Sequence, residues 1–86
     1  MINQKDNPIA WSQLMSELED AHEHIGQLIS EMNKAERIDI EAYTIDMGHI
    51  YAHLNRAWNT RNIEGEVTDA QWEDSRKYPK DLDPLA

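Results

Sequence analysis

Histidine is the residue of this chain whose spacing suggests chemistry. His49 and His53 stand four positions apart, about one turn of an α-helix, so two imidazoles on one helix can reach the same metal ion. Glu19 and His22 have the Glu-x-x-His spacing found in helical bundles that hold carboxylate-bridged metals. The candidate ligands for zinc or another divalent metal are therefore His22, His49, His53 and Glu19.

The angular positions of these side chains favour a second interpretation. On a helical wheel His53 lies at the border of the apolar stripe of its helix, and His49 lies further round, toward solvent. His24 lies off the apolar seam of the first helix, whereas His22 lies on it. In this interpretation His22 packs locally in the seam, the other histidines are surface residues, and the chain holds no cofactor.

Acidic residues outnumber basic ones by 17 to 8, which gives a net charge of −9. A surface of this sign repels nucleic acid and anionic membranes, so neither class of partner is expected. Glu17 and Asp20 match one Glu-x-x-Asp pair of the kind that holds Mg²⁺ in nucleotide-hydrolysing bundles, but the second helix has no matching pair. The acidic run is either solvated surface or a face for a basic partner protein. That face would consist of Glu17, Asp20, Glu23 and Glu31.

Several other kinds of chemistry have no support in the sequence. The chain has no cysteine, which excludes disulfides and thiolate metal sites. It has only three glycines and no glycine-rich phosphate loop, and its serines lie in helical context without a strained turn. The N-terminus lacks an apolar signal core, and no run of about 18 apolar residues occurs. We therefore expect a cytoplasmic, non-enzymatic protein without a membrane span.

The elements that position these residues are helices, and 86 residues allow one domain. The first helix is predicted over about 8–34, with Asn7 as its N-cap and Pro8 at its first position. Its main apolar positions recur at helical spacing. They are Trp11, Met15, Leu18, Ile25, Ile29 and Met32.

The second helix is predicted over about 39–62, with Asp39 as its N-cap. The turn between the two helices contains neither glycine nor proline, so a single unbroken helix through 34–38 is the alternative. A short helix over about 68–77 begins with a capping box formed by Thr68 and Gln71. Segments 1–6 and 79–86 are predicted to be loose tails.

A short turn makes the two long helices antiparallel neighbours, so residues whose numbers add to about 73 lie level. This rule brings Glu17 within reach of Arg56 and places Gly26 at a height similar to that of Gly48. A close approach of the two backbones would explain why glycine is tolerated inside both helices. Three tryptophans are expected in the core at one end of the molecule. They are Trp11, Trp58 and Trp72.

The apolar stripes of both helices are wider than a two-helix hairpin can cover. An exposed apolar patch of this kind marks an interface, so we expect a homodimer that closes into a four-helix bundle. The predicted function is a small acidic protein-interaction or regulatory protein. The alternative is a metal-binding bundle protein or enzyme that uses histidines and carboxylates of the long helices. The predicted interface residues are Leu14, Leu28, Tyr51 and Trp58.

Overall fold

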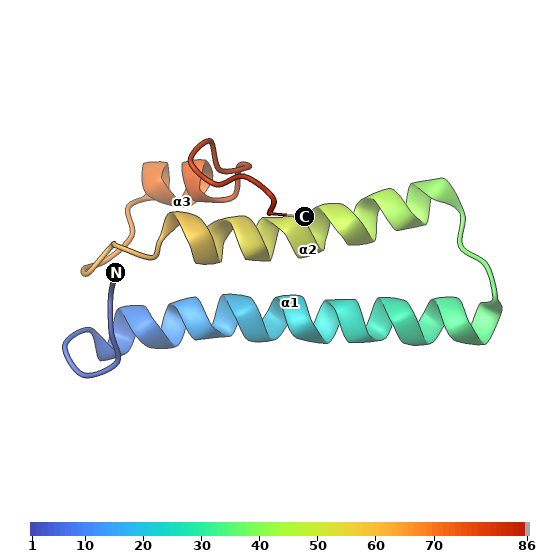
Figure 1. Cartoon of the computed structure of the whole chain (residues 1–86), viewed down its shortest axis with the longest axis horizontal. Coiled ribbons are helices and arrows are strands. Elements are labelled where there is room, and N and C mark those ends of the chain that lie inside the picture. The colour runs from blue at the N-terminus through green and yellow to red at the C-terminus, as the bar shows by residue number, and fades with distance from the viewer. Residues whose placement is uncertain (86) are drawn as a thin grey trace.

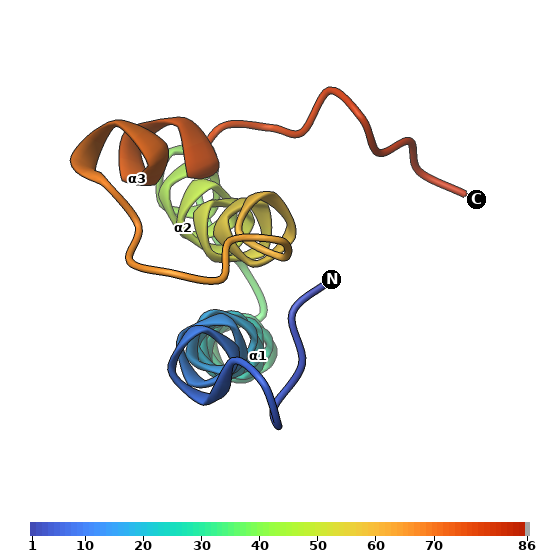
Figure 2. The same ribbon diagram turned by 90° about the vertical axis from the view of Figure 1, so that its left-hand side faces the viewer.

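The computed structural model describes residues 1–85, and these residues form three helices and no strand. Helices α1 (Pro8–Ala35) and α2 (Ile40–Asn59) run antiparallel along the long axis of the molecule (Figure 1). Helix α3 (Asp69–Ser75) packs on the side of α2 that faces away from α1 (Figure 2). The prediction of an all-α chain with three helices is confirmed. Ala86, the last residue of the tail predicted over 79–86, lies outside the described residues.

The N-terminal segment, predicted to be loose, packs against the hairpin. Ile2 is 4% exposed, and its backbone N–H donates to the carbonyl of Arg61 at 2.8 Å. A turn precedes α1, in which the N–H of Asp6 donates to Oδ1 of Asn3 at 2.8 Å. The side-chain oxygen of Asn7 accepts from the N–H of Asn3 at 3.3 Å, so it supports this turn instead of capping α1 as predicted.

The turn between α1 and α2 confirms two separate helices. Glu36 adopts a left-handed conformation, with φ 59° and ψ 17°, and its N–H donates to the carbonyl of Met32 at 2.8 Å. This is a usual way to end a helix, although glycine is the residue that adopts it most easily. Asp39 then caps α2 as predicted, because its side chain accepts from the N–H of Ala42 at 2.9 Å.

Helix α2 ends at Asn59, three residues before the predicted end. The hydroxyl of Thr60 donates to the carbonyl of Arg56 at 2.7 Å, and the N–H of Arg61 donates to the carbonyl of Trp58 at 3.2 Å. These bonds satisfy carbonyls of the last turn, so the backbone can leave the helix there.

Helix α3 begins with the predicted capping box, in which Thr68 and Gln71 exchange hydrogen bonds of 3.0 and 3.1 Å. Its C-terminal end is attached to α2 by two amide side chains. Asn55 donates to the carbonyl of Arg76 at 2.9 Å, and Asn59 donates to the carbonyl of Ser75 at 2.8 Å. Helix α3 therefore covers the C-terminal half of α2.

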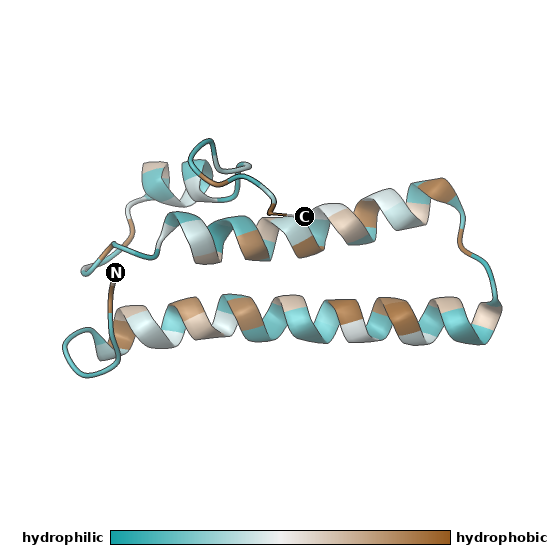
Figure 3. Ribbon diagram, viewed as in Figure 1, coloured by the Kyte–Doolittle hydropathy of each residue, from teal (hydrophilic) through white to brown (hydrophobic). Residues whose placement is uncertain are grey.

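Apolar segments recur along both long helices (Figure 3). The buried cluster at the open end of the hairpin consists of Ile2, Ala10 and Leu14, with Trp11 packed against it. Trp72 is 47% exposed, so its predicted place in the core is wrong. None of the three described helices has the length and apolar character needed to cross a membrane.

The two leucines predicted to lie at a dimer interface are buried within the chain. Leu14 is 5% exposed and packs with Ile2 and Ala10, and Leu28 is 7% exposed and lies beside residues of α2. Trp58 is half-buried, and its indole N–H donates to Asp81 of the C-terminal tail at 2.9 Å. Of the four predicted interface residues, only Tyr51, which is 41% exposed, is exposed as predicted.

Candidate metal centre

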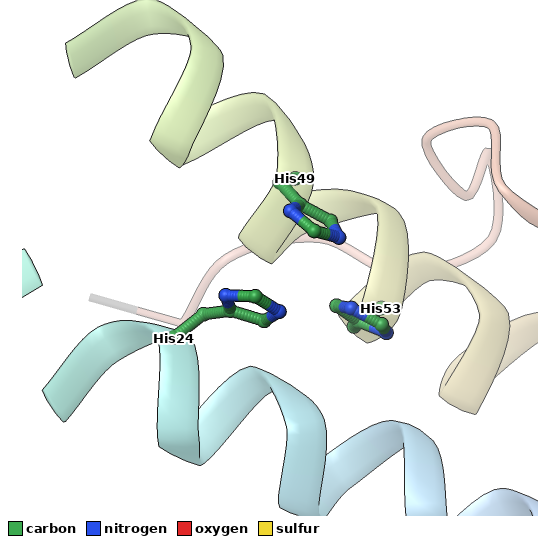
Figure 4. Close-up of side chains that lie close together, drawn as sticks. All are labelled: His24, His49 and His53. Atoms are coloured by element: carbon green, nitrogen blue, oxygen red, sulfur yellow. The ribbon is translucent and has the colours of Figure 1, made fainter. Parts of the chain in front are cut away.

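Three histidines converge in the space between the long helices. His24 comes from α1, and His49 and His53 come from α2. One ring nitrogen of each residue lies within 4.8 Å of the others, and the ring centroids are 4.2 to 5.3 Å apart. Figure 4 shows the imidazoles turned toward one another from the two helices. A single ion of the size of Zn²⁺ has ligand bonds of about 2 Å to nitrogen, so small rotations of these rings would bring all three to it.

The structure brings together two of the predicted ligands and adds a residue that the sequence interpretation excluded. His22 and Glu19 are exposed on α1, away from the cluster, and His24 takes the place expected for His22. The sequence did indicate that His24 lies near His49. The numbers of these two residues add to 73, as do those of Glu17 and Arg56, so each pair lies level in the antiparallel hairpin. A wheel drawn for α1 alone places His24 at the edge of the stripe, but α2 approaches along that edge.

A carboxylate and a guanidinium both contact Nδ1 of the buried histidine. Nδ1 of His53 lies 3.1 Å from Nη2 of Arg56, which can only donate, and 2.9 Å from Oε2 of Glu17, which can only accept. The same oxygen accepts from Nε of Arg56 at 2.9 Å, and both side chains of this ion pair are largely buried. In the tautomer whose Nδ1–H donates to Glu17, Nε2 of His53 keeps a lone pair. This arrangement matches the carboxylate–histidine–metal pattern in which an acid orients the ligand ring.

The Nε2 atom of His53 is the unexplained feature of the site. Nε2 of His53 is buried and has no hydrogen-bond partner among residues 1–85. Leaving a buried polar atom without a partner costs about 1–3 kcal/mol. Figure 4 shows the ring of His53 beside the rings of His24 and His49. A cation held by the three rings would satisfy this atom.

The environment of His49 favours its neutral form. Loss of surrounding water, followed by the nearby imidazoles of His24 and His53, lowers the pKa of His49 below its usual 6.5. Arg56 acts in the same direction, and Asp46 opposes it. Because only the neutral imidazole binds a metal, a lowered pKa keeps His49 ready to do so at neutral pH.

A small polar hollow of about 50 Å³ adjoins the cluster at His24 and His49. Gln27, Glu31 and Asp46 also line it, so oxygen ligands stand next to the histidines without belonging to the three-residue group. A hollow of this size holds a water molecule. The arrangement therefore leaves room for a fourth, non-histidine ligand.

The four residues of the predicted acidic face do not lie in equivalent places. Glu17 is only partly exposed, because it pairs with His53 and Arg56 between the helices. Asp20, Glu23 and Glu31 are exposed on α1. The predicted contact of Glu17 with Arg56 is confirmed. Because Glu17 also contacts His53, it supports the histidine cluster.

Comparison of the chain with protein-family models, with curated proteins and with solved structures finds no match.

Proposed function

We propose that this protein binds a divalent transition metal, zinc in the first instance, through His24, His49 and His53. The observation that supports the proposal most strongly is the buried, unpartnered Nε2 of His53, in a ring whose other nitrogen contacts the carboxylate of Glu17. A structural reason for keeping three imidazoles in contact is otherwise lacking, since each would repel the others once protonated.

The chemistry of the ligands restricts the metal. Imidazole nitrogen suits zinc, copper, nickel and iron, whereas Mg²⁺ and Ca²⁺ prefer oxygen ligands. Three histidines also leave one position of a tetrahedral ion for water or an added ligand. The metal would connect α1 to α2 and so stabilise a chain that is small for a self-sufficient core.

Metal binding is tested with protein purified without a histidine tag. Elemental analysis and calorimetric titration with Zn²⁺, Ni²⁺ and Mg²⁺ should give one Zn²⁺ or Ni²⁺ per chain and no Mg²⁺. His49→Ala is the preferred variant because His49 is exposed, and loss of this ligand should weaken Zn²⁺ binding by at least about tenfold. His24→Ala and His53→Ala should have the same effect.

The matched control is His22→Ala, because His22 is an exposed histidine on the same helix as His24. This variant should bind Zn²⁺ as the unmodified protein does. Equal losses from His22→Ala and His49→Ala would contradict the site. So would the absence of both stoichiometric metal and any rise in melting temperature with Zn²⁺.

The binding of a basic partner protein, without catalysis, stays a separate prediction. It now rests on Asp20, Glu23 and Glu31, which are exposed on one helix. An electrostatic partner of this kind should be retained in low salt and lost in high salt. A pull-down from extract with the triple Asp20→Asn, Glu23→Gln, Glu31→Gln variant as control tests it.

A further inference from the structure

The two sides of the α1–α2 hairpin differ in character, and Leu28 lies between them. On one side Leu28 borders the polar hollow of the histidine cluster. On the other it lines an apolar groove of about 390 Å³, together with eight more residues of α1 and α2, all of them aliphatic, methionine or tyrosine. The apolar side is thus distinct from the proposed metal site, and an inference about it does not depend on the metal.

Large apolar side chains stand exposed around this groove. Ile25 is 38% exposed, Ile29 55%, Tyr51 41% and Leu54 37%. A second hollow of about 230 Å³ shares Met32 and Tyr43 with the groove and extends it to Ile38 and Ile40. We call the residues that line the two hollows the apolar face. The apolar face therefore follows both long helices as far as the turn that joins them.

The described part of the chain does not cover the apolar face. The C-terminal tail touches it through Tyr78, whose ring meets that of Tyr51 edge-on with centroids 5.4 Å apart. Asp81 then holds the tail at Trp58 and Arg61, near the other end of α2. Tyr51 is still 41% exposed after its contact with the tail.

The chemistry of the apolar face selects its partner. No acidic or basic residue lines either hollow, although the chain carries a net charge of −9. A basic partner protein would find nothing there to pair with. A second copy of this chain would place its own uncharged apolar face against the first. Mutual repulsion of the acidic surfaces elsewhere on the two copies disfavours other orientations.

The incomplete core also indicates a second copy. Among the described residues no large side chain is fully buried, and the one buried cluster lies at the open end of the hairpin. The half of the hairpin nearer the turn therefore exposes apolar surface that a folded protein normally covers. Two further helices laid against this half would give each long helix the neighbours that it has in a four-helix bundle.

We propose that two copies of this chain associate through the apolar face, about a two-fold axis, to form a four-helix bundle. Ile29 and Tyr51 stand at the rim of the groove, and Leu28 and Ile50 are buried in its floor. In a two-fold interface the rim residues of each copy enter the groove of the other. The two histidine clusters then lie on the outer sides of the dimer, one for each chain.

The test is the mass of the full chain in solution, measured by light scattering and by sedimentation at micromolar concentrations. The unmodified protein should have twice the 10.0 kDa mass of one chain. Ile29→Glu places a charge at the rim of the groove and should give a monomer. Ile45→Glu is the matched control, because Ile45 is 71% exposed on α2 but lines neither hollow, and this variant should remain dimeric.

Two readouts separate loss of the interface from loss of the fold or of the metal site. Circular dichroism should show that Ile29→Glu keeps its helices, and Zn²⁺ titration should give the same stoichiometry per chain as for the unmodified protein. A monomeric unmodified protein at all concentrations tested would overturn the proposal. Equal dissociation by Ile45→Glu and Ile29→Glu would also overturn it.

Discussion

At the scale of single residues, Glu17 connects Arg56 to the histidine cluster. One of its oxygens accepts from His53 and from Arg56, both at 2.9 Å. Arg56 in turn lies over the ring of Trp72, 4.7 Å from its centroid, so the same chain of contacts reaches α3. In the proposed metal site Glu17 would therefore orient His53 without binding the metal itself.

Glu17→Gln should lower Zn²⁺ affinity by about 10- to 100-fold, which is the usual effect of altering a carboxylate that supports a metal-binding histidine. The neutral amide would hold Nδ1 of His53 less strongly than the carboxylate does, and the ion pair with Arg56 would be lost. Asp20→Asn removes the same charge from an exposed position on α1 and serves as the control. Calorimetric titration compares them, and equal effects would mean that net charge alone is responsible.

A second residue-scale prediction concerns the attachment of the C-terminal tail. The indole N–H of Trp58, and to a lesser extent the guanidinium of Arg61, hold the pKa of Asp81 below its usual 3.8. A lowered carboxyl pKa contributes stability above pH 3.8 that is lost as the pH falls through the folded-state value. Trp58 fluorescence should therefore change in the acid range below pH 3.8.

In Asp81→Ala the tail is no longer held at Trp58. The Trp58 fluorescence of this variant at neutral pH should therefore equal that of the unmodified protein in acid, with no further change in that acid range. Trp11 and Trp72 also emit, so the double variant Trp11→Phe, Trp72→Phe is used as the background for both proteins. Helix content from circular dichroism should remain constant across the transition. A fluorescence change of the same size in Asp81→Ala would assign the titration to another group.

At the scale of elements, the two long helices do not approach closely at their glycines. An added Cβ at Gly26 or Gly48 would meet no atom of the described residues within 4 Å. The expectation of a close backbone approach is therefore wrong. Helix packing here is set by larger side chains, among them Leu28 and Ile50, which are buried between α1 and α2.

Gly26→Ala and Gly48→Ala should each raise the free energy of unfolding by about 1 kcal/mol, because alanine restricts the unfolded chain and finds open space in the fold. Gly65→Ala, in the loop before α3, is the control and should change stability much less. Urea denaturation measures all three. A loss of stability in either helical variant would contradict the prediction.

At the scale of the whole molecule, the hairpin has its two proposed binding functions on opposite sides. The histidine cluster would join α1 to α2 within a chain, and the apolar face would join one chain to another. Since Leu28 contributes to both sides, the helices have to keep one mutual orientation for both to form. A metal that holds the hairpin together should therefore strengthen the dimer as well.

Zn²⁺ at about one hundred times its dissociation constant should raise the free energy of unfolding by about 2.7 kcal/mol, because it binds the folded chain selectively. A chelator should reverse the gain. Thermal denaturation of the unmodified protein and of His49→Ala, with and without Zn²⁺, measures the effect. A Zn²⁺-dependent gain of the same size in His49→Ala would place the ion elsewhere.

The features that the sequence determined by itself are those that depend on neighbours along the chain. Pro8 starts α1, Asp39 caps α2, and Thr68 with Gln71 starts α3. The pairing of Glu17 with Arg56 also followed from the sequence, because the position of the turn in an antiparallel hairpin sets the register of its two helices.

The tertiary structure decided which flank of each apolar stripe meets the other helix. A helical wheel gives the angle of a side chain on its own helix, but the direction of approach results from the packing of all the elements together. That direction buries Leu14 and Leu28, leaves Ile29 and Tyr51 exposed, and brings His24 to the other histidines in place of His22.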